Sequence, residues 1–364
     1  MKTTSATDAG FLAVLLGTLV LSMADSNLAL AVDACSAPSG STSIVILSNS
    51  DTYVSIPYAR APLYCGTILS ISNSTLTVQG APGWSTGQWS QLTTNGYFPN
   101  YVVLTSGAKE GATFTVTNNS SDSLEAVGLE DLSGVVTGDQ LAIIPYWSLG
   151  TAFPGGAGIT PSTSAIAAGR RTQLFSLDAH TYSGLNPNQV FFFFNNAWRR
   201  VGSAATSNYN DVVILPERNF ILRQNFSGAT NVTFTAAGNV AEYSVRIYLE
   251  QAITNTFTGD NYVGNYHSTT QTLNQSNLAA ILSASDPGAS PPVLNDLLLV
   301  YDNAAAAINK TPAHIYFYYN GHWADLSNPP YTVDRGADPV FIPGGGVTVR
   351  KKLGSGSSIW VIPP

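Results

Sequence analysis

The chain has 364 residues, of which 10% are charged and 44% hydrophobic, and its formal net charge is −7 at pH 7. This length suggests two or three domains with sizeable cores. The acidic balance argues against nucleic acid and anionic membrane surfaces as partners, because both attract a stripe of Lys and Arg that this sequence lacks. Short β-branched and aromatic runs, separated by Gly, Pro, Asn and Ser, predict an all-β protein.

Residues 1–31 have the features of a secretory signal peptide. Lys2 supplies a positive charge, the segment from Phe11 to Met23 is apolar, and Ala29-Leu30-Ala31 fits an A-x-A cleavage site. The apolar run is shorter than the roughly 20 residues of a membrane helix, and no later segment qualifies as one. We therefore expect a secreted protein, extracellular or periplasmic, without a transmembrane segment after signal removal.

The sequence contains two cysteines, Cys35 and Cys65. In an oxidising compartment they are predicted to form a disulfide, which would close a loop of about 30 residues and contribute roughly 3–4 kcal/mol. The alternative is a lipoprotein, because Val32-Asp33-Ala34-Cys35 faintly resembles a lipobox. Asp33 fits that motif poorly, and lipidation would leave Cys65 free.

Residues 35–150 are predicted to form an N-terminal barrel or sandwich domain, because their short strands alternate in polarity and are separated by turn residues. Residues 152–170, rich in Ala, Ser and Gly, are predicted to be a linker. The expected strands are Ser43–Leu47, Thr67–Ile71, Thr75–Val78, Tyr101–Leu104, Thr113–Val116 and Leu141–Ile144.

An internal repeat fills the C-terminal half. Phe191-Phe192-Phe193-Phe194-Asn195-Asn196-Ala197-Trp198 returns as Tyr316-Phe317-Tyr318-Tyr319-Asn320-Gly321-His322-Trp323. Each copy continues with an Asp and an apolar run that ends in Pro, Asp211–Pro216 and Asp338–Pro343. This predicts two copies of one β-sandwich-like unit, at 171–258 and 296–364. Between them, 259–295 is expected to be a linker with one short helix, from Asn277 to Ser283.

The repeated segments are predicted to be β-hairpins, because Asn320-Gly321 is a strong signal for a two-residue turn. Such a loop pairs Tyr319 with His322 and Tyr318 with Trp323. One face of the second hairpin, with Ile315 and Phe317, is then expected to be core. The opposite face carries Tyr316, Tyr318, Trp323 and Asp325, and two hypotheses apply to it. It is either packed inside the protein or a platform on which a sugar ring stacks.

The search for catalytic and metal-binding patterns predicts neither a catalytic residue nor a cofactor or metal. Gly83-Trp84-Ser85-Thr86-Gly87 fits G-x-S-x-G, but no helix is expected after Ser85, as a nucleophile elbow requires. Glu130-Asp131 is interpreted as a solvated turn, with a calcium site or a glycosidase carboxylate as alternatives. The hairpin pairing puts His314 and His322 roughly 17 Å apart, too far to share one metal ion.

Several motifs together resemble a family of exported, β-rich bacterial proteins that is known only as hypothetical proteins of unassigned activity. The resemblance covers most of the mature chain and implies no substrate and no catalytic residue. The motifs are Ala81-Pro82-Gly83-Trp84, Ser106-Gly107, Glu110-Gly111, Gly138-Asp139, Ile144–Gly150, the two Asn-x-x-Trp hairpins and Ile214-Leu215-Pro216.

Three functions are open on these grounds. The first is a non-enzymatic structural or adhesive module of the cell surface or the extracellular space. The second is a carbohydrate-binding protein that uses the aromatic hairpin face, and the third is a secreted hydrolase.

Overall fold

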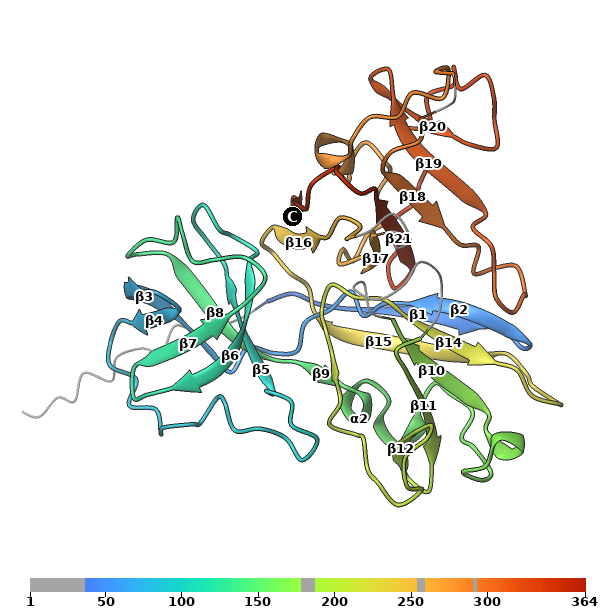
Figure 1. Cartoon of the computed structure of the whole chain (residues 1–364). Helices are drawn as coiled ribbons and strands as arrows, with labels where there is room; N and C mark the ends of the chain where they lie inside the picture. The colour runs from blue at the N-terminus through green and yellow to red at the C-terminus, as the bar shows by residue number, and fades with distance from the viewer. Residues whose placement is uncertain (1–36, 178–186, 254–258, 291–292) are drawn as a thin grey trace, which may run out of the picture. The chain divides into compact units, whose positions relative to one another are not determined.

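The computed structural model describes residues 37–177, 187–253, 259–290 and 293–364 (Figure 1). Strands dominate these residues and the few helices are single turns, so the prediction of an all-β protein is confirmed. The predicted signal peptide and Cys35 lie outside the described residues. No described helix has the length and apolar character required to cross a membrane.

A closed six-stranded barrel forms the first compact part, which confirms the predicted small barrel. Its strands are β3 (Tyr64–Ser72), β4 (Thr75–Val78), β5 (Asn100–Leu104), β6 (Thr113–Asn119), β7 (Ser123–Val127) and β8 (Gln140–Pro145). They follow the order β3-β4-β7-β6-β5-β8 around the barrel. Alternate residues such as Ile68, Val102 and Phe114 fill the interior. Register shifts in β3 and β6 bend the strands, as closure of a small barrel requires.

The second part, copy 1, is a β-sandwich of a five-stranded sheet and a two-stranded ribbon. Its strands are β1 (Ser39–Ile46), β2 (Ser50–Val54), β10 (Thr172–Ser176), β11 (Gln189–Phe194), β12 (Ala197–Arg200), β14 (Phe220–Gln224) and β15 (Val232–Asn239). The sheet order is β12-β11-β10-β14-β2, and β1 pairs with β15 in the ribbon (Figure 1). Phe234 of the ribbon and Phe191 and Trp198 of the sheet share one hydrophobic core.

The third part, copy 2, repeats this topology strand for strand. Its strands are β16 (Val245–Leu249), β17 (Gly259–Gly264), β18 (Leu297–Val300), β19 (His314–Tyr319), β20 (His322–Asp325), β21 (Gly346–Lys351) and β22 (Ser358–Ile362). The sheet order is β20-β19-β18-β21-β17, and β16 pairs with β22. The predicted fold of two tandem sandwich-like units is therefore confirmed.

Short elements connect these strands. In copy 1, β9 (Trp147–Ser148) pairs with β13 (Val213–Ile214), and a single isolated bridge between Gln271 and Phe341 takes this place in copy 2. Ser148 caps the one-turn helix α2 (Leu149–Ala152). The predicted helix near residue 280 is the 3-10 turn η3. In the part of the chain that the structure describes, the 3-10 turns are η1 (Pro154–Gly156), η2 (Ala167–Gly169) and η3 (Leu278–Ile281).

The repeat unit in the structure is larger than the one picked out by the sequence. Copy 1 already begins with β1 and β2, which lie within the predicted N-terminal domain of 35–150, and the barrel is inserted between β2 and β9. In copy 2 the corresponding strand β17 begins at Gly259, inside the predicted linker. A short sequence match marks this pair of strands, because Asp51-Thr52-Tyr53-Val54 corresponds to Asp260-Asn261-Tyr262-Val263.

The predicted hairpin registers are confirmed. Tyr319 pairs with His322 and Tyr318 with Trp323 in copy 2, and Phe193 pairs with Trp198 in copy 1. The turn residues Asn195-Asn196 and Asn320-Gly321 all have positive φ, as a type I′ turn requires.

The two copies meet through equivalent residues. Ser55 donates its backbone N–H to the Gly344 carbonyl (2.8 Å), and its counterpart Gly264 donates to the Glu217 carbonyl (3.1 Å). Glu217 and Gly344 are themselves equivalent, since each follows the Pro that ends the repeated apolar run. This reciprocity is the signature of an isologous contact, so the copies pair within one chain as two identical subunits would.

Close contact at this junction requires small residues in one of the copies. A Cβ on Gly346 would lie 2.6 Å from the Cβ of Asn219, its equivalent in copy 1. Gly346→Asn, which restores the sister residue, should therefore lower the free energy of unfolding by about 2–3 kcal/mol through overpacking. Urea unfolding followed by circular dichroism measures this. Gly288→Asn is the control, since that position does not have a left-handed φ and the nearest atom to its Cβ would be Asp286 Oδ1 at 3.6 Å. Equal effects at both sites would contradict the close packing.

Candidate functional site

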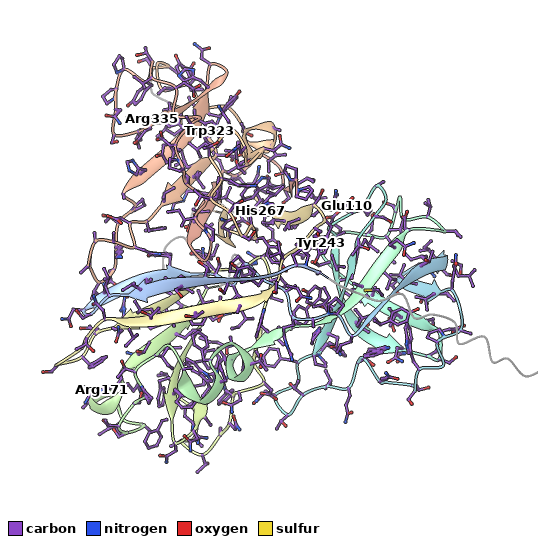
Figure 2. All side chains as sticks on the ribbon, turned by 180° about the vertical axis from the view of Figure 1, so that it is seen from behind. Glu110, Arg171, Tyr243, His267, Trp323 and Arg335 are labelled. Atoms are coloured by element: carbon purple, nitrogen blue, oxygen red, sulfur yellow. The ribbon has the colours of Figure 1, made fainter. Side chains whose placement is uncertain are left out.

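The predicted sugar platform is part of the core of copy 2. Trp323 is fully buried, Tyr316 is 3% exposed and Asp325 is 2% exposed. Tyr318 is half-buried and its ring meets Trp323 edge to face. Trp323 also accepts a hydrogen bond at its carbonyl from the backbone N–H of Arg335, and both residues lie in copy 2 (Figure 2).

This burial contradicts a stacking platform on the hairpin, because Tyr316 and Trp323 have almost no surface that a ligand could reach and Tyr318 is partly buried. The ribbon of β16 and β22 covers this side of the sheet and contributes Ile247 and Trp360 to the same core. The other hairpin face is also largely buried, with Phe317 and Ala324 fully enclosed. In copy 1 the equivalent Trp198 is buried in the same way.

Asp325 orients a histidine at the edge of the sheet. Its carboxylate lies 2.8 Å from Nδ1 of His314, whose side chain is half exposed. Burial alone would raise the pKa of the Asp325 carboxyl, but hydrogen bonds from the backbone N–H of Ser327, from His314 and from the Ser327 hydroxyl outweigh it and hold this pKa below its usual range. Since a carboxylate only accepts hydrogen bonds, Nδ1 carries the proton and Nε2 is the acceptor of the neutral ring.

His314 borders a cavity of about 480 Å³ that is lined mainly by copy 2 and is completed by Ser43 and Ile44 from β1 of copy 1. The wall is mostly apolar, with a few polar side chains and a glycine-rich segment before β21. This composition is typical of pockets for small molecules. The lining residues are Ser43, Ile44, Val300–Ala304, Ala313, His314, Val340, Ile342, Pro343 and Gly345–Val347.

Copy 1 has a cavity at the equivalent place, but its volume is only about 120 Å³. The two cavities differ in a five-residue segment that begins with the Pro at the end of the repeated apolar run. Copy 1 has Pro216-Glu217-Arg218-Asn219-Phe220, and copy 2 has Pro343-Gly344-Gly345-Gly346-Val347. Arg218, Asn219 and Phe220 line the small cavity, whereas glycines and a valine leave the other one open.

Sequence reasoning missed this pocket, although two signals were available. One is the run of three glycines where the sister copy has Glu, Arg and Asn. The other is His314, which we had considered only as a metal ligand. Its counterpart across the duplication is Gln189, because Ser176 pairs with Gln189 and Val300 pairs with His314. The pairing of an acid with a histidine therefore distinguishes copy 2 from copy 1.

The other sequence candidates are structural in the described part of the chain. Turns follow Ser85, as expected, and not a helix. Glu130 accepts hydrogen bonds from Arg246 (2.9 and 2.8 Å) and Lys109 (3.0 Å), so it joins the barrel to β16 and is not a solvated turn residue. Its pKa is lowered, because these bonds outweigh the opposite effect of burial. Asp131 is exposed and accepts from Ser133.

Metal binding gains no support from the described residues, whereas Cys65 is not a free thiol. Among residues 37–177, 187–253, 259–290 and 293–364, no group of three His, Cys, Asp or Glu side chains could hold a metal ion. The first cysteine of the predicted pair, Cys35, lies outside the described residues, so its bond to Cys65 remains a prediction.

Four tyrosines cluster where the barrel contacts copy 2. Tyr101 and Tyr146 belong to the barrel, Tyr243 and Tyr266 to copy 2, and the rings of Tyr101 and Tyr146 lie 4.7 Å apart. Burial raises the pKa of Tyr243 to about 12. It also raises the pKa values of Tyr101, Tyr146 and Tyr266, and neighbouring phenols raise that of Tyr101 further.

This cluster predicts a loss of stability at alkaline pH. The folded protein holds the phenol protons more tightly than the unfolded chain, whose tyrosines titrate near pH 10. The stabilisation is therefore complete below pH 10 and is lost as the pH rises towards 12, by about 1.4 kcal/mol per pH unit for each such tyrosine. Urea unfolding between pH 8 and 11.5 measures the slope. Tyr243→Phe should reduce this slope by the contribution of one tyrosine, about 1.4 kcal/mol per pH unit. A free energy of unfolding that stays constant up to pH 11 would contradict the prediction.

The chain was compared with protein-family models, with curated proteins and with solved structures. No family model, no curated protein and no solved structure matches it. The site is therefore interpreted from its own geometry, and the resemblance to exported β-rich proteins remains an expectation.

Proposed function

We propose that this chain is an exported, non-enzymatic module with a structural or adhesive role at the cell surface or in the extracellular space. The observation that carries the proposal is the reciprocal pairing of the two sandwich copies. It makes one block of two modules, since equivalent hydrogen bonds hold both sides of the junction. Such a block is suited to a structural protein that bears mechanical load or to an adhesive protein that presents a binding surface.

The buried charges support the same proposal, because they connect neighbouring strands or parts of the chain. Asp51 pairs with Arg223 and Asp260 with Arg350 at equivalent positions of the two sheets. In copy 2 the carboxylate of Asp296 lies 3.0 Å from Nζ of Lys351, and both side chains are fully buried. An acid that is engaged in such an ion pair is needed to balance the buried cation and is not available as a general acid or base.

Retention on purified polymers tests this function. The purified mature protein would be incubated with isolated cell envelopes and with insoluble cellulose, chitin and peptidoglycan, and the bound fraction measured together with released reducing sugar. We expect retention on at least one polymer without release of soluble products. The heat-unfolded protein is the control for nonspecific adsorption. Release of sugar would overturn the non-enzymatic role, and failure to bind any polymer would overturn the adhesive one.

A further inference from the structure

We propose that the open pocket of copy 2 binds a neutral sugar unit. Asp302 and His314 would accept hydrogen bonds from its hydroxyls, and Ile44, Ile342 and Pro343 would pack against its C–H face. This inference rests on the adhesive function proposed above and names the class of ligand. It also replaces the aromatic hairpin face, which is buried, with a site that is open.

The volume of the cavity fits such a ligand. Pockets for small molecules measure roughly 300–1,000 Å³, and the cavity of copy 2, at about 480 Å³, lies in that range. The equivalent cavity of copy 1, at about 120 Å³, lies below it. The duplication thus supplies an internal comparison, because the same fold and strand register have a closed pocket in one copy and an open one in the other.

Close packing explains two of the three glycines that open the pocket, but not the third. A Cβ on Gly344 would lie 2.5 Å from Cδ1 of Ile44, and one on Gly346 would meet Asn219. Gly345 does not have a left-handed φ, and the nearest atom to its Cβ would be the Ile342 carbonyl oxygen at 3.1 Å. A side chain at position 345 therefore requires only a small shift, so the absence of one is better explained by the space it keeps open.

The polar groups of the pocket favour a ligand that donates hydrogen bonds. Asp325 fixes Nδ1 of His314 as the donor, which leaves Nε2 as an acceptor on the half-exposed ring. Asp302 uses Oδ1 to accept the backbone N–H of Ala304 (2.7 Å), and Lys310 binds its backbone carbonyl and not its carboxylate. Among the described residues no ion pair to Asp302 is formed, although the Lys310 ammonium offsets part of its charge. The exposed carboxylate at the rim disfavours phosphates, sulfates and carboxylates.

The apolar wall completes the match to a sugar. Ile342 is 58% exposed although it lines the cavity, and Ile44, Pro343 and Val347 continue the apolar surface. A pyranose has one such face of C–H groups and a rim of hydroxyl donors. Hydroxyls at the rim can reach the carboxylate and imidazole acceptors while the C–H face covers the apolar wall.

Binding to defined oligosaccharides tests the proposal. An array of neutral cello-, xylo-, manno-, malto- and chito-oligosaccharides would be probed with the mature protein, with polygalacturonate and a sulfated glycan as acidic controls. Affinities for the oligosaccharides that bind would then be measured by calorimetry. We expect binding to a neutral oligosaccharide and not to the acidic glycans.

Three substitutions connect binding to the pocket. Gly345→Arg introduces the residue of the closed sister pocket and should abolish binding, and Gly345→Ala should change it little. His314→Gln introduces the residue found at the equivalent position of copy 1, and Asp302→Asn removes the negative charge. Each should weaken binding about tenfold, the effect of losing one hydrogen bond to a charged or well-oriented group. Circular dichroism checks that each variant is folded. If Gly345→Arg does not fold, the affinity of Asp302→Asn tests the binding site instead, because the Asp302 side chain is exposed at the rim of the pocket.

Three results would overturn the inference. These are binding that is unchanged in both Gly345→Arg and Asp302→Asn, a preference for the acidic glycans, and a lack of binding to every oligosaccharide. Retention on polymers with unchanged affinity in the pocket variants would remove this site and leave the adhesive function standing. Release of sugar from a polymer would remove the adhesive, non-enzymatic function itself.

Discussion

Replacing Trp323 with alanine should lower the free energy of unfolding by about 3–5 kcal/mol, the usual cost of removing a large aromatic side chain from a core. Trp323 has no exposed surface and packs in one cluster with Tyr316, Phe341 and Trp360. The loss combines the transfer energy of the indole with the cavity it leaves. Urea unfolding followed by circular dichroism at pH 7 gives the value.

Two further variants separate the core role of Trp323 from a binding role. Trp323→Phe keeps most of the packing and removes an indole N–H that has no partner in the described structure, so it should cost much less than alanine. Trp198→Ala, at the equivalent position of copy 1, should cost as much as Trp323→Ala, since that side chain is also fully buried. A Trp323→Ala protein of unchanged stability that has lost polysaccharide binding would show instead that the ring is a ligand platform.

The sequence predicted the hairpins correctly because their register depends on local chemistry. A two-residue turn with positive φ fixes which residues face each other, and the period of two then fixes which side chains share a face. Pairs such as Tyr318 and Trp323 follow from these two rules alone. The alternating strands likewise predicted a small barrel or sandwich, and the structure has the barrel.

The sequence could not predict which hairpin face is buried, because that depends on distant strands. The layer over Trp323 is a ribbon whose second strand, β22, comes from the end of the chain. Tyr and Trp are compatible with either a core or an exposed surface, so the pattern alone leaves the choice open.

The extent of copy 1 was hidden by the inserted barrel. β2 ends at Val54 and its neighbour β14 begins at Phe220, so the pairing that completes the sheet spans most of the first half of the chain. The match between Asp51-Thr52-Tyr53-Val54 and Asp260-Asn261-Tyr262-Val263 is only four residues long. The pocket could not be predicted for the same reason. Its glycines and His314 stand out only when the two copies are compared position by position.

Asp51→Ala should also lower the free energy of unfolding by about 3–5 kcal/mol, because it leaves the Arg223 guanidinium without its partner in a largely buried site. The carboxylate of Asp51 is 1% exposed and binds Nε and Nη2 of Arg223 at 2.6 Å each. It also accepts the backbone N–H of Asn309 at 2.8 Å, so it fixes a loop of copy 2 against the edge of copy 1. Limited proteolysis should therefore cut the segment 303–309 faster in this variant.

A double-mutant cycle shows how much of this loss in the free energy of unfolding comes from the unpaired Arg223 guanidinium. Asp51→Ala combined with Arg223→Met removes both charges, and its cost should be smaller than that of Asp51→Ala alone, since an apolar pair of similar volume often replaces a buried ion pair with little loss. Asp260→Ala in copy 2 is the matched variant, because Asp260 binds Arg350 with the same two-point geometry (2.6 and 3.0 Å). If Asp51→Ala costs less than about 1 kcal/mol, the pair behaves like an exposed surface ion pair. The junction of the two copies would then depend on its other contacts, among them the reciprocal backbone hydrogen bonds and the hydrogen bond from Asn219 Nδ2 to the Val347 carbonyl.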